Sequence, residues 1–273
     1  MIKKGWLIGA LMLTIGTVNA QGVYTGIGIG YGFSSPTDLL GTKAEIDNAG
    51  NTTESNIYGS FGAGLNSSIN VGYMFGEHFG VDLGINYFLG SKVISSETNT
   101  PVGFSKVTSH SNQLRLIPSF VMSTGGKLSL YTRAGFIFPT IGVTISELRG
   151  DFMGSTTEQD FETKGAFTVG YHGAFGGKYN VNDHISLFAE ISGAYLRIKS
   201  KTRTQTKSTS NGVDILDMMT TYQKEINYTD ELNGNSNNYS INPNASGDSA
   251  REELATKSNY NGAFLNVGVK YYF

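Results

Sequence analysis

The sequence FGVDLGINYFL at residues 79–89 alternates between apolar residues and small or polar residues. Alternation with a period of two is typical of a β-strand that has one apolar face. The stretch follows a Gly-Glu-His turn at residues 76–78, so the chain is expected to reverse immediately before this strand. The predicted apolar face consists of Phe79, Val81, Leu83, Ile85, Tyr87 and Leu89, and the opposite face carries Gly80, Asp82, Gly84 and Asn86.

The same alternation recurs in seven further segments of the chain. These predicted strands are 23–33, 61–75, 113–122, 128–138, 167–179, 185–195 and 262–273. Short turns join three pairs of strands, at 76–78, 123–126 and 180–184, and long polar loops join the others, at 34–56, 92–110, 146–163 and 200–259. An even number of strands with short turns at one end and long loops at the other is typical of membrane-spanning barrels.

The composition excludes several other classes of protein. Glycine accounts for 36 of 273 residues, about 13%, whereas charged residues make up 15% and aromatic residues 12%. These values disfavour helical bundles and disordered chains. Because cysteine is absent, disulfide scaffolds, thiol nucleophiles and cysteine metal sites are excluded. The net charge of −2 provides no basic field that would attract nucleic acid.

The N-terminus has the features of a secretory signal peptide. Lys3 and Lys4 precede a mostly apolar run over 5–15, and Val18-Asn-Ala20 provides the short side chains that signal peptidase requires. We therefore predict a signal peptide at 1–20, cleavage after Ala20 and a mature domain at 21–273. The alternative, a membrane anchor, is disfavoured because the run is too short to cross the bilayer. No later run of about 20 apolar residues exists, so a closed barrel is the remaining way to span a membrane.

The residues on the two faces indicate which face is outside. A soluble barrel needs many charged residues on its outer face, but here the polar face is mostly glycine, serine and asparagine. Aromatic residues lie near the ends of the apolar face, as expected for girdles at the two membrane interfaces. These aromatic residues are Tyr31, Phe33, Phe75, Phe79, Tyr195 and Tyr271. The predicted fold is an all-β, eight-stranded, antiparallel up-and-down transmembrane barrel with long extracellular loops.

Two stretches extend this interpretation to a known family. Leu114-Arg-Leu-Ile-Pro-Ser-Phe120 and Leu130-Tyr-Thr-Arg-Ala-Gly-Phe-Ile-Phe-Pro139 are similar to sequences in barrel proteins common in Bacteroidetes. With the signal peptide, eight strands and terminal Phe273, the chain resembles small outer-membrane barrels of the OmpA/OmpX type. The resemblance implies a monomer in the Gram-negative outer membrane, in contact with lipid and lipopolysaccharide. Tyr271 and Phe273 would then form the signal read by the barrel assembly machinery. Since the chain stops at Phe273, we expect no peptidoglycan-binding domain.

The inward face carries charged residues that are candidates for a functional network. An eight-stranded barrel is just wide enough for side chains to fill it. Arg115, Arg133 and Glu190 lie at similar numbers of residues from their turns, so the two arginines are expected to meet Glu190 across the lumen. Two interpretations remain open, a neutralised packed plug and a narrow or gated path for ions or small solutes. The inward charged set is Asp82, Arg115, Arg133, His172, Lys178, Glu190 and Lys270.

No catalytic, cofactor or metal site is predicted. A hydrolase or transferase needs a nucleophile, a base and an orienting acid near the outer rim. His78 and His184 fall in turns and His172 points inward, so only His110, between Ser109 and Ser111, lies near the outer surface. The acidic residues of the loops lack the spacing of a calcium loop. We expect no enzyme activity; a lipid-modifying barrel enzyme is the third alternative.

The segment 200–259 is the longest connection and the main candidate for recognition. Long loops without secondary structure are usually functional or disordered. Residues 213–227 alternate in part, which predicts a hairpin, and Tyr222, Tyr228 and Tyr239 offer contact area to a partner. The sequence thus favours a structural or surface-presenting role, with adhesion of an extracellular ligand or host surface through the outer loops. A pore is the alternative.

Overall fold

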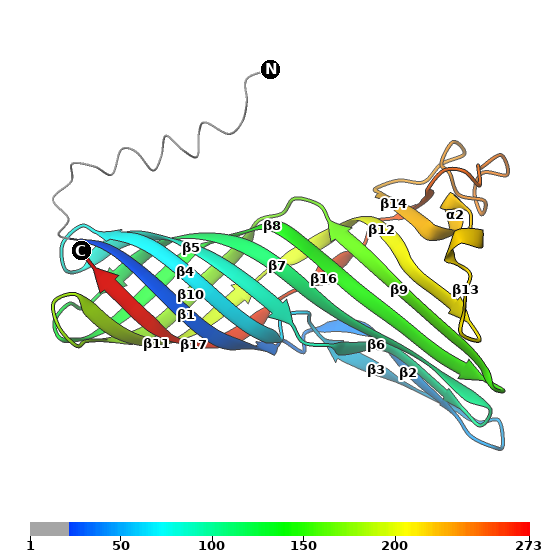
Figure 1. The fold of residues 1–273 in the computed structure, drawn as a ribbon, viewed down its shortest axis with the longest axis horizontal. Coiled ribbons are helices and arrows are strands. Elements are labelled where there is room, and N and C mark those ends of the chain that lie inside the picture. Colours follow the sequence, from blue (N-terminus) through cyan, green and yellow to red (C-terminus); the bar gives the residue numbers. More distant parts are fainter. Residues whose placement is uncertain (1–21) are drawn as a thin grey trace.

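Eight antiparallel strands form a closed barrel in the computed structural model, which describes residues 22–273 (Figure 1). Each strand pairs with the next along the chain, and the last strand pairs with the first, so the predicted barrel is confirmed. The three predicted turns lie together at one end, here called the turn end. The predicted signal peptide lies outside the described residues. The barrel strands are β1 (Val23–Ser34), β4 (Gly64–Met74), β5 (Phe79–Gly90), β7 (Gly103–Ser123), β8 (Leu128–Phe152), β10 (Gly170–Asn180), β11 (Ile185–Tyr195) and β17 (Gly262–Tyr272).

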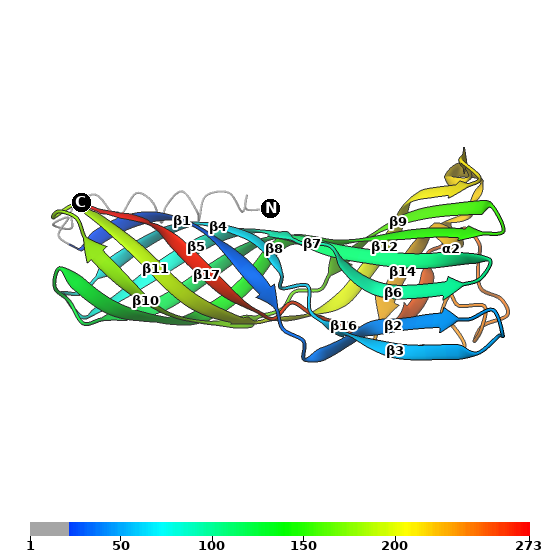
Figure 2. The same ribbon diagram turned by 90° about the horizontal axis from the view of Figure 1, so that it is seen from below.

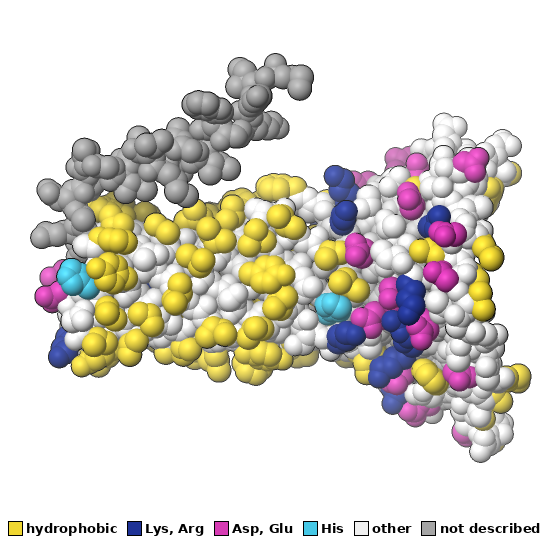
Figure 3. Space-filling model, in the orientation of Figure 1, with side chains coloured by type: hydrophobic (Ala, Val, Ile, Leu, Met, Phe, Trp, Pro, Cys, Tyr) yellow, Lys and Arg dark blue, Asp and Glu magenta, His cyan; other side chains and the backbone are white. Residues whose placement is uncertain are grey.

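The outer surface of the closed barrel is an apolar band. Figure 3 shows hydrophobic side chains covering this half of the molecule, whereas charged side chains gather beyond it. Ile27, Ile69 and Val267 point outward, and Asp82 and Glu190 are buried inside. The prediction of the outward and inward faces is therefore confirmed for these residues. No helix within residues 22–273 is long and apolar enough to cross a bilayer.

Inward glycines make room for aromatic side chains in the lumen. A Cβ atom at Gly72 would lie 2.4 Å from the ring of Tyr24, and one at Gly268 would lie 2.6 Å from the ring of Phe188. A side chain at Gly72 would require the Tyr24 ring to move, and one at Gly268 would clash with the backbone carbonyl oxygen of Ile27 (2.2 Å) as well as with the Phe188 ring. The high glycine content thus follows from filling a narrow lumen with large residues.

Apart from residues 230–250, which contain no strand or helix, the four long connections are not loops, and this part of the prediction is wrong. They form strands that continue beyond the barrel as a second region, the distal extension (Figure 2). β7 and β8 are much longer than predicted, because they run on through this region. The other strands of the distal extension are β2 (Asp38–Ile46), β3 (Thr52–Gly59), β6 (Val93–Thr100), β9 (Ser155–Gly165), β12 (Arg197–Ser210), β13 (Val213–Asp214), β14 (Glu225–Thr229), β15 (Arg251–Leu254) and β16 (Lys257–Asn259).

The strands of the distal extension form an open sheet in the order β3-β2-β6-β7-β8-β9-β12-β14-β15. The β2–β6 and β14–β15 pairs are parallel, and the others are antiparallel. The predicted hairpin at 213–227 is also wrong, because β13 and β14 both pair with β12. Between them lie the 3₁₀ helix η1 (Leu216–Met218) and the short helix α2 (Thr221–Lys224).

The barrel wall is interrupted where the two regions meet. The β8–β10 ladder ends at Ile137 opposite Gly170, and the β8–β9 ladder starts only at Thr144 opposite Thr163. Residues 138–143 of β8 therefore have no ladder partner on this side. A cavity of about 370 Å³ opens here between β8 and the chain at 163–167. The closed barrel ends at this interruption.

Candidate functional site

Arg133 occupies the centre of the barrel lumen, between two buried carboxylates. Its guanidinium pairs with Glu190 of β11 at 2.6 Å and with Asp82 of β5 at 3.3 Å. Two tyrosines complete the shell, because Tyr131 donates to Glu190 (2.8 Å) and Tyr24 donates to Asp82 (3.1 Å). Charged hydrogen bonds of this kind are strong, and the loss of one partner is costly. The predicted meeting of Arg133 with Glu190 is present, with Asp82 as a second partner.

The two inward lysines lie on aromatic rings nearer the turn end. The ammonium of Lys270 lies 4.6 Å from the ring centre of Tyr24 and 4.9 Å from that of Tyr131. The Lys178 ammonium donates to the hydroxyl of Tyr272 at 3.1 Å and borders a cavity at the turn end. Cation–π contacts with desolvated rings stabilise buried ammonium groups. Neither lysine forms an ion pair with a carboxylate among the described residues.

Arg115 does not meet Glu190, which corrects the prediction. Its Nε donates to Gln113 at 2.8 Å, and its guanidinium lies 4.4 Å from the ring centre of Phe88. Counting residues from each turn assumes that the strands are parallel to the barrel axis. In a real barrel the strands tilt, so equal counts on distant strands give different heights.

A chain of asparagines, which the sequence did not reveal as a unit, crosses the lumen toward Glu190. Asn86 donates to Asn66, Asn66 donates to Asn266 at 2.9 Å, and Asn266 donates to Glu190 at 3.3 Å. Each amide has its oxygen toward the previous residue and its donor toward the next. In the sequence these residues are only small polar residues on the inward face, because cross-strand partners depend on register.

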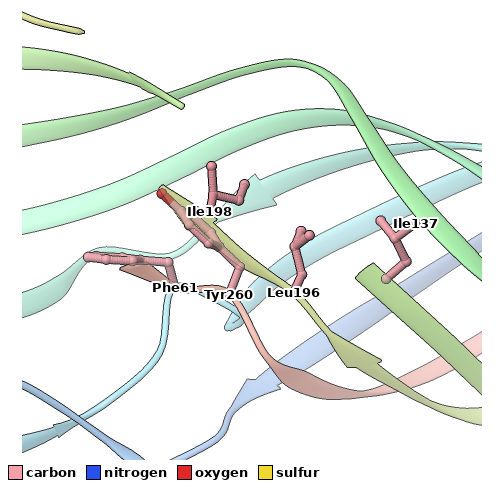
Figure 4. Close-up of a cluster of buried hydrophobic side chains, with 5 residues drawn as sticks. All are labelled: Phe61, Ile137, Leu196, Ile198 and Tyr260. Atoms are coloured by element: carbon pink, nitrogen blue, oxygen red, sulfur yellow. The ribbon is translucent and has the colours of Figure 1, made fainter. Parts of the chain in front are cut away.

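An apolar lid closes the lumen toward the distal extension (Figure 4). Tyr260 stacks near Phe61, with their ring centres 5.5 Å apart, and its hydroxyl forms a 2.7 Å hydrogen bond with Thr144. The sequence predicts a strand over 61–75, in which the alternation places Phe61 on the apolar, lipid-facing side. It lies instead before β4, where the chain has left the barrel wall and folds inward. The lid consists of Phe61, Ile137, Leu196, Ile198 and Tyr260.

The space between the Arg133 pairs and the lid is small. It is a cavity of about 40 Å³, bordered by Arg115, Arg133, His172 and Glu190. Such a volume holds a small number of water-sized molecules and no continuous path. The lumen is therefore filled by side chains at the level of Arg133 and again at the lid.

The four histidines lie in three separate places. His78 and His184 bond to backbone carbonyls at the turn end, at 3.1 and 2.9 Å. His172 borders the lumen cavity, and His110 lies on β7 in the distal extension. Within residues 22–273, no group of three or more His, Asp and Glu residues is placed to hold a metal ion.

The chain is similar to two solved outer-membrane proteins and matches one family model. Neisserial surface protein A is 12% identical, with a TM-score of 0.41, and the match covers 92% of this chain and 97% of that one. The outer membrane protein OprG from Pseudomonas aeruginosa is 14% identical, with a TM-score of 0.43, covering 93% and 96%. No protein with a curated description matches the chain. The model of the outer membrane protein beta-barrel domain matches residues 8–273. The chain therefore belongs to the family of outer membrane proteins with this beta-barrel domain.

Proposed function

We propose that the protein is a closed outer-membrane barrel whose role is structural and whose distal extension is presented outside the cell. The observation that carries this proposal is the filled lumen. Arg133 is bonded to carboxylates on two other strands, and the apolar lid lies above it. Opening a path would require both layers to move, which would break buried ion pairs. The distal extension, by contrast, is an ordered polar sheet that a rigid barrel holds in place.

Electrical recording in planar bilayers tests this proposal against the pore alternative. We expect no steady conductance from the purified protein. As a positive control, Tyr260→Ala with Arg133→Ala removes one large side chain from each layer of the closure, and we expect openings from this variant. Discrete large openings of the unmodified protein, altered by Glu190→Gln, would support a pore for ions or small solutes and overturn the proposal.

Adhesion is the second function that we propose, because the far tip of the distal extension exposes apolar side chains. Met153 is 83% exposed and holds a left-handed backbone (φ 52°) in the turn between β8 and β9. Asn, Asp or Gly is favoured in such turns, so an exposed methionine here has no local structural benefit. Val102, in the turn between β6 and β7, and Val213, the first residue of β13, are also exposed. Two backbone hydrogen bonds of 2.8 Å tie the three turns together, from Met153 to Val102 and from Asn211 to Thr156.

Removing these apolar groups tests adhesion. Cells expressing Met153→Ser with Val213→Ser are expected to adhere several-fold less to phenyl-coated surfaces and to an epithelial cell layer. Leu128→Ser is the matched control, because the exposed fraction of Leu128 lies between those of Met153 and Val213, but Leu128 lies at the turn end. Equal adherence of all three strains would remove adhesion from the proposal and leave the structural role.

The remaining expectations on partners and catalysis are part of the same proposal. We propose a monomer that contacts lipid and lipopolysaccharide, binds no nucleic acid and catalyses no reaction. Tyr271 and Phe273 are proposed as the assembly signal; their rings pack edge to face with centres 5.2 Å apart at the C-terminal end of β17, which lies at the turn end. Deleting Phe273 should lower the amount in the membrane without affecting export, and unchanged insertion kinetics would contradict this role.

A further inference from the structure

Arg115 is a buried cation that has no anionic partner among the residues that the structure describes. Its side chain is 2% exposed, and its Nη2 has no hydrogen-bond acceptor among residues 22–273. The neutral Gln113 amide and the face of the Phe88 ring are its polar and aromatic contacts. An unpaired charge in such an environment is strongly unfavourable. Arginine does not escape this cost by losing its proton, because its guanidinium stays charged in proteins.

The charges of the rest of the lumen balance without Arg115. Nearer the turn end, the carboxylates of Asp82 and Glu190 offset the positive charges of Arg133 and Lys270. Lys178 borders the cavity that opens at the turn end, where solvent screens its ammonium. The buried lumen is therefore left with one excess positive charge, and this charge is on Arg115.

The cavity beside Arg115 is suited to a small anion. It is about 40 Å³ and is bordered by Arg115, Ser68, Asn70, His172 and Ser192. These side chains supply hydroxyl, amide and ring N–H donors, and the Nδ1 of His172 has no partner among the described residues. Glu190 also borders the cavity, but its carboxylate already accepts hydrogen bonds from Arg133, Tyr131 and Asn266.

We propose that this cavity is a binding site for one monovalent inorganic anion of chloride or bromide size, held by the Nη2 of Arg115. The anion cancels the single excess charge and accepts a hydrogen bond from the unpaired Nη2 of Arg115. A neutral water molecule could accept this hydrogen bond but would not cancel the charge. The site does not depend on the adhesive or structural role outside the cell. It makes the stability of the barrel depend on the kind of anion present, in addition to ionic strength.

The dependence on anion is measurable on the folded protein in detergent. The protein is refolded in sodium chloride, sodium bromide or sodium gluconate at equal ionic strength, and the unfolding midpoint is followed by the heat-induced gel shift and by circular dichroism. Gluconate is too large for the cavity. We expect the midpoint to be higher in chloride and bromide than in gluconate by about 2–4 °C, through preferential binding to the folded state.

Variants assign the effect to the site. Arg115→Gln is expected to abolish the difference between chloride and gluconate. Arg149→Gln is the matched control, because Arg149 is in the distal extension and not in the lumen; this variant should keep the difference. Equal midpoints of the unmodified protein in chloride and gluconate, or an undiminished difference in Arg115→Gln, would overturn the proposal.

Crystallography provides a readout that does not require the variant to fold. Crystals of the unmodified protein grown in sodium bromide should show an anomalous peak in the cavity within about 3.5 Å of Arg115. Density without an anomalous signal would mean that water occupies the site, and the proposal would be wrong. The bilayer recordings are independent of this result, so failure of the anion site and failure of the closed-barrel role are distinguishable.

Discussion

The closed barrel and the distal extension are both β-sheets, but they place their charges in opposite environments. In the closed barrel, Arg133 and its partners are buried beneath an apolar outer surface. In the distal extension, Arg149 makes an equally short 2.6 Å pair with Asp160, but both side chains are partly exposed to solvent. The same interaction therefore has different consequences. The loss of one partner is costly in the buried pair, because the other charge is left without solvent or a counter-charge. In the exposed pair, solvent screens the charge that remains.

The largest expected effect on stability comes from replacing Arg133, and replacing Arg149 provides the comparison. Arg133→Ala leaves two buried carboxylates without a cation and should destabilise the barrel by about 3–5 kcal/mol. Arg149→Ala removes a solvent-screened pair and should cost less than about 1 kcal/mol. Urea unfolding followed by circular dichroism measures both. Similar losses in the two variants would show that the regions do not differ as their burial indicates.

The lid provides a second comparison, between two leucines. Leu196 is fully buried in the lid, whereas Leu39 on β2 is exposed in the distal extension. Leu196→Ala should cost about 2–4 kcal/mol through lost burial and the cavity that it leaves. The free energy of unfolding of Leu39→Ala should stay within about 0.5 kcal/mol of that of the unmodified protein. A negligible loss in Leu196→Ala would mean that the lid does not stabilise the barrel.

A smaller effect is expected from pH at His110 in the distal extension. Burial lowers the pKa of His110 below its ordinary value, and nearby Lys92 lowers it further, while Glu147 opposes the shift. As the pH falls, the imidazole of His110 is therefore protonated in the unfolded chain before it is protonated in the folded protein. The stability that neutral His110 provides is fully present above about pH 6.5, and the free energy of unfolding decreases as the pH falls below that value. Because the ring is partly exposed, the change should be well below about 1 kcal/mol.

Hydrogen exchange checks the histidine prediction. After correction for intrinsic rates, amides of β7 around His110 should exchange faster at pH 5.5 than at pH 7.5, and His110→Gln should remove the difference. Amides of the closed barrel serve as the internal reference. A difference that persists in His110→Gln would assign the pH effect to another group.

The smallest effect on the barrel should follow from trimming the distal extension. Replacing residues 234–249 with a short Gly-Ser linker removes Asn237, whose side chain donates to the carbonyls of Ser246, Ser249 and Ala250. Local order near β15 should be lost, but the heat-induced gel shift should be unchanged, since closure entropy depends weakly on loop length. Failure of the trimmed chain to assemble would show that this segment contributes to barrel folding.

The same contrast explains what could be predicted from the sequence. In the closed barrel, one face contacts an apolar surrounding and the other a polar lumen, so alternation identified all eight strands and their faces. In β6 and β9, neither face is apolar, as in the sequence STTEQDFETKG at Ser155–Gly165. Without alternation, strands of this kind are indistinguishable from loops by pattern.

The sequence predicts which residues line the candidate site, but not which of them are in contact. Alternation places Arg133, Glu190 and Asp82 inside the barrel, but their contacts depend on strand tilt and register. For this reason the prediction succeeded for Arg133 and failed for Arg115. The lid was missed because Leu196 and Tyr260 lie between strands, where periodicity carries no information.

The continuous β7–β8 pair has a mechanical consequence. Among the described strands, these two alone run through both regions, paired from Gly103 opposite Phe152 down to Ser123 opposite Tyr131, a length of about 70 Å. A pull on the tip along the barrel axis would load in shear the hydrogen bonds that join these strands to β5 and β10, so that many bonds share the force. A sideways pull would bend the pair at residues 138–143 of β8, which have no ladder partner on the side away from β7. The molecule should thus resist tension along its axis and flex under lateral force.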